Sequence, residues 1–321
     1  MEKKLLKVLA LCVLLSTMAV TTFAAGQKEA VKNDKPVVGL VMKSLANEFF
    51  MSMEAGAKAY AKQDGSFELI TMGMNSETDF DTQVNAIDSL IARGVDLIVL
   101  APADSVGMVG PVKKALAAGV TVINFDVTLN KAALKAAGLP EEFLFVGPDN
   151  TAGAEMVGNF LGTKLGKGGK VFIIEGNPGA DNATQRKVGF QKAATTHGLI
   201  VLASNTAHWE TEEANTLMTN LLTKHPDVQG VMCANDSMAL GVVRALEAAG
   251  RKDVLVVGFD NIPAVKDLIL KDKMLATVHM DGPEMAILAF NAGFEILAGK
   301  RQNLGWVPSP LILADKSFFN K

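Results

Sequence analysis

The sequence predicts an α/β protein built from two successive halves, each with a mostly parallel central sheet. Short apolar segments of strand length alternate with segments whose apolar residues recur at helical spacing. The alternation stops near residues 127–148 and then begins again, which indicates two halves. The strand segments are apolar throughout, and this is typical of parallel strands covered by helices on both faces.

The beginning of the chain has the pattern of a secretory signal. A short basic start precedes an apolar run at residues 8–15, and the small residues Thr22, Ala24 and Ala25 follow. We expect a cleaved signal peptide at residues 1–24 and a flexible leader at 25–35. The apolar run is shorter than the about 20 residues of a membrane span, which disfavours an uncleaved anchor. Leu11 before Cys12 disfavours a lipid-attachment site.

Composition excludes several classes of function. The full chain has 31 basic and 34 acidic residues, and removal of residues 1–24 takes away three lysines and one glutamate, which leaves a net charge of −5. A weakly acidic chain disfavours nucleic acid as a partner. Cys233 is the only cysteine after residue 24, so no internal disulfide can form, and the four histidines lack the spacing of a zinc site. We expect no metal and no cofactor.

The elements of the first half can be read in order along the chain. We expect strands at residues 37–42, 67–72, 96–100, 121–125 and 143–146. Helices are expected around residues 50–60, 84–91 and 109–116, because their apolar residues share one helical face. The stretch 127–148, rich in alanine and lysine, predicts an inserted helix.

The second half repeats the alternation. Strands are expected at residues 170–174, 200–203, 228–233, 254–258 and 276–279, with helices at 152–165, 183–195, 210–222, 237–248, 264–270 and 284–297. A final strand is expected near residues 311–313. This tail is typical of a chain that crosses back between two lobes.

Polar residues gather directly after the predicted strands. In parallel α/β sheets, ligands bind outside the carboxyl ends of the strands. The candidates at those ends, with nearby aromatic residues, are Asn47, Phe49, Phe50, Asp126, Arg186, Trp209, Asn235, Phe259 and Asp260.

These residue types suit a neutral polyhydroxylated ligand. Carboxylates and amides pair with hydroxyl groups, and arginine offers a rigid fork of donors. Aromatic rings cover the C–H faces of a sugar. Some of the residues also have a structural interpretation: Asn47 can cap a helix, and one of Phe49 and Phe50 is expected in the core. Asp126 and Asp260 each end a strongly apolar strand, where a carboxylate needs a partner.

Several segments resemble the periplasmic ribose-type sugar-binding proteins of bacterial ABC importers, which share their core with lac-repressor-type regulators. They include "LANEFFMSMEAGAKAYAK", "GVDLIVLAPADS", "AGVTVINFD", "HPDVQGVMCANDSMALGVVRALEAAG" and "VLVVGFDNIP". The resemblance implies the periplasmic binding protein type I fold, with two Rossmann-like lobes joined by a three-crossing hinge. The N-terminal lobe would comprise residues 36–148 and 281–309, and the C-terminal lobe 149–280 and 310–321.

The resemblance also assigns residues to the site. Asn47, Phe49, Phe50 and Asp126 would come from the N-terminal lobe; Arg186, Trp209, Asn235, Phe259 and Asp260 would come from the C-terminal lobe. Two further positions depart from the ribose pattern: Lys43 stands where a small hydroxyl residue is usual, and Met280 stands where a glutamine is usual. Val127 replaces an arginine. These departures indicate that the ligand is not simply ribose; another pentose, a hexose or a short polyol fits.

The resemblance implies a monomeric periplasmic receptor that captures a small neutral sugar or polyol by hinge closure and delivers it to the permease subunits of an ABC importer. One alternative is the same type of receptor acting with a chemoreceptor in chemotaxis. A second is an exported carbohydrate-active enzyme using Asp126 and Asp260 as an acid–base pair. We expect no enzymatic activity and no catalytic residue, because no nucleophile–base motif is found.

Overall fold

A computed structural model of the chain describes residues 35–320. The predicted signal peptide, and the leader before residue 35, lie outside the described residues. Two six-stranded sheets, each covered by helices on both faces, make up the described chain. This arrangement confirms the predicted α/β class with two lobes.

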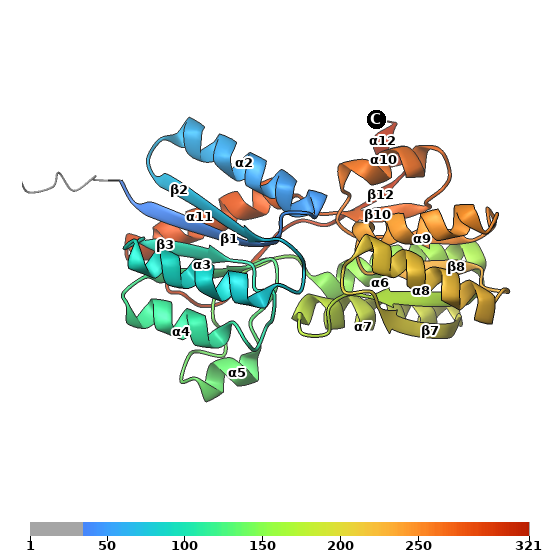
Figure 1. Cartoon of the computed structure of the whole chain (residues 1–321), viewed down its shortest axis with the longest axis horizontal. Helices are drawn as coiled ribbons and strands as arrows, with labels where there is room; N and C mark the ends of the chain where they lie inside the picture. Colours follow the sequence, from blue (N-terminus) through green and yellow to red (C-terminus); the bar gives the residue numbers. More distant parts are fainter. Residues whose placement is uncertain (1–34, 321) are drawn as a thin grey trace, which may run out of the picture. The chain divides into compact units, whose positions relative to one another are not determined.

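The first sheet has the strand order β11-β5-β4-β3-β1-β2, and all its neighbouring strands are parallel. Its strands are β1 (Val37–Ser44), β2 (Glu68–Met74), β3 (Leu97–Leu100), β4 (Thr121–Phe125), β5 (Phe145–Gly147) and β11 (Trp306–Pro308). Helices α2 (Glu48–Asp64) and α11 (Gly282–Leu297) pack together on one face (Figure 1). The other face is covered by α3 (Phe80–Ala92) and α4 (Val109–Ala117). The predicted inserted helix is α5 (Lys131–Ala136).

The second sheet has the order β12-β10-β9-β8-β6-β7. Its strands are β6 (Lys170–Glu175), β7 (Ile200–Thr206), β8 (Gly230–Cys233), β9 (Leu255–Val257), β10 (Ala276–His279) and β12 (Ile312–Asp315). Only β12 is antiparallel to its neighbour among these strands. Helices α6 (Asn150–Leu165) and α7 (Asp181–His197) pack together, as do α8 (Thr211–Lys224) and α9 (Asp236–Ala248). Helix α10 (Pro263–Leu270) packs on α12 (Lys316–Phe319).

The chain passes three times between the sheets. It leaves the first sheet between β5 and α6, returns between β10 and α11, and leaves again between β11 and β12. These passages are the three hinge crossings that were expected. The lobe boundaries proposed at residues 148, 280 and 309 stay a prediction.

The central strands are buried as their apolar character predicts. Every residue of β3 and of β8 is buried, whereas β7, at the edge of the second sheet, is half-exposed. Several helices begin at a residue whose side chain accepts a hydrogen bond from the first turn, for example Asn47 before α2 and Asn235 before α9. Such caps fix where the loops after β1 and β8 turn into helix.

No helix within residues 35–320 is long and apolar enough to cross a membrane. Over the same residues, no group of three or more metal-binding side chains is placed to hold a metal ion.

Candidate functional site

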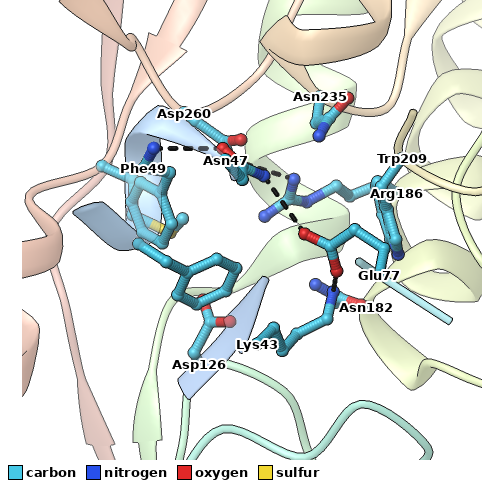
Figure 2. Close-up of a pocket in the computed structure, with 12 residues that line it drawn as sticks. Lys43, Asn47, Phe49, Glu77, Asp126, Asn182, Arg186, Trp209, Asn235 and Asp260 are labelled. Carbon is cyan, nitrogen blue, oxygen red and sulfur yellow. Dashed lines mark hydrogen bonds and ion pairs between the residues drawn. The ribbon is translucent and has the colours of Figure 1, made fainter. Parts of the chain in front are cut away.

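A small cavity lies where the carboxyl ends of strands from the two sheets face each other. Lys43 is at the end of β1, Asp126 directly follows β4, and Asp260 follows β9. Figure 2 shows their side chains around one common space. The residues that line the cavity are Lys43, Asn47, Phe49, Phe50, Glu77, Asp126, Asn182, Arg186, Trp209, Asn235, Asp260 and Met280.

Arg186 is fixed in place by three acceptors and one ring. Its Nε donates to Asn150 Oδ1 at 2.8 Å, and its Nη1 donates to the carbonyl oxygen of Ala234 at 2.8 Å and to Asp260 Oδ1 at 3.2 Å. Its guanidinium carbon lies 3.7 Å from the centre of the Phe259 ring. Stacking and a fork of hydrogen bonds together hold a planar guanidinium in one orientation.

Lys43 and Glu77 form a second buried ion pair. Lys43 Nζ lies 2.8 Å from Glu77 Oε2, and both side chains are less than 5% exposed. Asn47 Nδ2 donates to the other oxygen, Glu77 Oε1, at 3.3 Å, while Asn47 Oδ1 accepts from Phe49 N at 3.0 Å and so caps α2. Asn47 therefore links the start of α2 to the pair.

Asp126 is the carboxylate that neither pair neutralises. No side chain of the described residues forms a hydrogen bond or ion pair with it, and the residue is 2% exposed. Burial raises its pKa above the ordinary value, and the charges of Lys43 and then Arg186 limit the rise. A buried carboxylate without a partner is costly, so a ligand that donates hydrogen bonds to Asp126 is stabilised there.

The pKa of Asp260 is raised as well. Burial raises its pKa to about 7, and the Arg186 guanidinium opposes the rise. Asp126 and Asp260 also share a backbone peculiarity: their φ angles are +62° and +114°, in the region that favours glycine. Such strained residues persist where the surrounding structure holds them, and they are frequent at binding sites.

Aromatic rings form the apolar part of the wall. The Phe49 and Phe50 rings meet edge to face with centroids 5.2 Å apart. Trp209 has a φ of +71°, and its indole lies so close to Gly176 that a Cβ there would come within 2.1 Å of the ring. Lys43 Nζ lies 5.0 Å from the centre of the Trp209 ring. Gly176 is thus required for the position of the indole.

Besides Glu77 Oε2, which is held in the ion pair with Lys43, two polar atoms of the cavity wall have no hydrogen-bonding partner within the described part of the chain. They are Trp209 Nε1, a donor, and Asn182 Oδ1, an acceptor, and both are buried. Native structures rarely leave such groups unpaired. Together with Asp126 they offer one donor and several acceptors to a small polar molecule.

The structure brings nearly all the expected site residues together. Every residue expected in the site lines the cavity except Phe259, which is fully buried beneath the Arg186 guanidinium. Sequence reasoning missed Glu77 and Asn182. Glu77 follows β2, so the rule applied to the other strand ends would have found it, and Asn182 lies four residues before Arg186 on the same face of α7.

Comparison with known proteins identifies the family of this chain. Residues 38–301 match the family model described as a periplasmic binding protein domain, and the chain belongs to this family. It is similar to the D-ribose/D-allose-binding protein of Pseudomonas aeruginosa, with 43% identity over 271 residues that cover 83% of this chain and 84% of that protein. It is also similar to the ribose import binding protein of Escherichia coli, with 33% identity over 83% of this chain and 86% of the relative.

Solved structures that are similar to this chain are also solute-binding proteins. An ABC transporter solute-binding protein from Burkholderia multivorans, whose unknown ligand was represented as α-D-erythrofuranose, is 42% identical with a TM-score of 0.83. The match covers 87% of this chain and 99% of that one. A periplasmic solute-binding protein from Actinobacillus succinogenes with bound D-allose is 36% identical with a TM-score of 0.84, over 89% and 99% of the two chains.

Proposed function

We propose that this protein is a periplasmic receptor that binds a small neutral monosaccharide or polyol and delivers it to an ABC importer. The observation that carries the proposal is the charge arrangement of the cavity. Lys43 is neutralised by Glu77 and Arg186 by Asp260, so a ligand meets two compensated pairs and one buried carboxylate, Asp126. Hydroxyl groups satisfy such a set, since each can donate to an oxygen and accept from an N–H group.

The aromatic lining of the cavity favours a sugar ring. The aromatic rings of Phe49, Phe50 and Trp209 suit the C–H surfaces of such a ring. The relative named for D-ribose and D-allose, and the solved relative with bound D-allose, make these two sugars the first candidates.

Binding and release follow from a hinge. A ligand that contacts both lobes stabilises the closed form, and this shifts an open–closed equilibrium. Asp126 lies in the first lobe, directly after β4, and Arg186, Asn235 and Asp260 lie in the second lobe, so one ligand in the cavity bridges both lobes. A micromolar Kd corresponds to about −8 kcal/mol, which three or four charge-assisted hydrogen bonds of about 1.5–3 kcal/mol each can supply.

We further propose that residues 1–24 are a signal peptide cleaved on export, that the receptor is a monomer, and that it is not an enzyme. The signal proposal rests on the basic start and short apolar run of the sequence. Relatives that are binding proteins support the absence of catalysis. A second role is open to the same closed form, which could bind a chemoreceptor as well as the permease.

A thermal-shift screen of the mature protein tests the proposal. The protein is first unfolded and refolded to remove any sugar retained from expression, and then heated with pentoses, hexoses and four- to six-carbon polyols. A ligand at 100 times its Kd stabilises the native state by about 2.7 kcal/mol, which gives a clear rise in Tm. Absence of a rise with every compound contradicts the proposal, and conversion of a bound sugar, followed by NMR, contradicts the non-enzymatic role.

A further inference from the structure

Helices of the second lobe differ in how their N-termini are capped. The side chains of Asp149 and Asn235 cap α6 and α9 from the residue just before each helix. Helices α7 and α10 begin after Ala180 and Ile262, whose side chains form no such hydrogen bond. Unsatisfied N–H groups at a helix start need an acceptor from elsewhere.

For α7, the acceptor comes from the other lobe. Asp181 N, the first amide of the helix, donates to Ser105 Oγ at 2.9 Å. Ser105 lies in the loop after β3, and its own amide donates to the carbonyl oxygen of Gly179 at 2.9 Å. Asp181 also accepts a hydrogen bond from Thr128 Oγ1, which follows β4. The start of α7 is thus bound to two loops of the opposite lobe.

Helix α10 shows the same arrangement. Ala264 N, in its first turn, donates to Glu48 Oε2 at 3.2 Å, and Glu48 is the first residue of α2 in the other lobe. None of Ser105, Asp181 and Glu48 lines the cavity. These bonds exist only while the lobes are together, because each joins segments of different sheets.

We propose that Ser105 and Glu48 are affinity-setting residues: they cap α7 and α10 across the cleft, and thereby favour the closed form without touching the ligand. The proposal rests on hinge closure as the mode of binding. In the open form water solvates the two amides; in the closed form a side chain of the other lobe replaces that water. The caps that α6 and α9 carry lie within one lobe and do not depend on closure, whereas the caps of α7 and α10 couple helix capping to ligand capture.

The expected effect on affinity follows from the closed population. When the ligand requires the closed form and the open form predominates, the apparent Kd is inversely proportional to the closed fraction. Loss of a typical N-cap changes an equilibrium constant by about five-fold. Ser105→Ala is therefore expected to raise the Kd about five-fold, and Ser105→Ala with Glu48→Ala about twenty-five-fold if the two sites are independent.

Two measurements test the proposal. They are the Kd from calorimetric titration with D-ribose and D-allose, and the Tm of the ligand-free protein. Ser105→Ala should raise the Kd and leave the ligand-free Tm unchanged, because the cap is absent from the open form. Asp79→Ala, a matched control, removes the cap that accepts from Thr82 N within the first lobe, and should lower the Tm at constant Kd. Glu48→Gln keeps an acceptor oxygen and should bind more tightly than Glu48→Ala.

An equal Kd for the wild type and Ser105→Ala overturns the inference but leaves the proposed function intact. Failure of the wild type to bind any sugar contradicts the proposed function instead. A measurement without ligand covers that case: spin labels on Lys62→Cys in α2 and Lys224→Cys in α8 report the distance between lobes, since Cys233 is buried. The double variant Ser105→Ala with Glu48→Ala should show a smaller closed fraction, and identical distance distributions overturn the inference.

Discussion

Closure without a ligand should depend on pH, because it buries Asp260 with too few partners. In the closed form burial raises the pKa of Asp260 to about 7. In an open, hydrated cleft Arg186, which belongs to the same lobe, would still lie beside it, and we expect a pKa no higher than the ordinary value of 3.8. The closed form therefore binds the proton more tightly than the open form. Lowering the pH favours empty closure, and the gain is lost as the pH rises through about 7.

The magnitude follows from the difference in pKa. Each unit is worth about 1.36 kcal/mol, so a change from pH 8 to pH 5 is expected to favour the closed form by about 3 kcal/mol, or roughly a hundred-fold in the open–closed ratio. Asp126 acts in the same direction, because burial raises its pKa as well. Arg186 and Lys43 face both carboxylates and limit the two rises.

The labelled pair on α2 and α8 measures this effect in the ligand-free protein. The closed fraction should increase as the pH is lowered from 8 to 5, and Asp260→Asn should remove the larger part of the change. A closed fraction independent of pH over this range would refute the reasoning. So would an unaltered pH dependence in Asp260→Asn.

Three further predictions concern single side chains. Trp209→Phe keeps an aromatic ring but removes the unpaired Nε1 donor, so calorimetry should show a Kd about five- to ten-fold weaker; an unchanged Kd would mean that Nε1 does not reach the ligand. Lys43→Met and Glu77→Gln should each lower the Tm of the ligand-bound protein, since each leaves a buried charge unpaired, and the double variant should recover most of the loss; additive losses contradict a coupled pair. Burial, and then the charge of Asp260, raise the pKa of Asp236 well above its ordinary value, so the contribution of Asp236 to stability falls as the pH rises through its raised pKa. Asp236→Asn should therefore flatten the dependence of the Tm on pH above the ordinary value of 3.8, and parallel Tm curves for the two proteins would count against this reasoning.

The alternation of strands and helices was predictable because burial on both faces leaves continuous apolar runs. Strand β11 was not predicted. It has three residues, includes a proline, and exposes 52% of Trp306, so nothing in its local pattern marks a strand. Its extended form depends on pairing with β5, which lies about 160 residues earlier in the chain.

The site residues were predictable where they follow the carboxyl end of a parallel strand, since ligands bind there. Asp126 and Asp260 stand out because each follows an apolar strand directly. Phe259 was expected to line the site, but its ring stacks on the Arg186 guanidinium and does not line the cavity. The Lys43–Glu77 pair joins the ends of β1 and β2, and no spacing in the sequence shows that these side chains meet.

Calorimetric titration of the refolded mature protein with D-allose and D-ribose tests the central claim most directly. The account predicts one binding site per chain for at least one of the two sugars, a Kd in the micromolar range or tighter, and loss of most of the affinity in Arg186→Ala. Absence of binding heat for both sugars, at concentrations up to the millimolar range and without a rise in Tm, would contradict it.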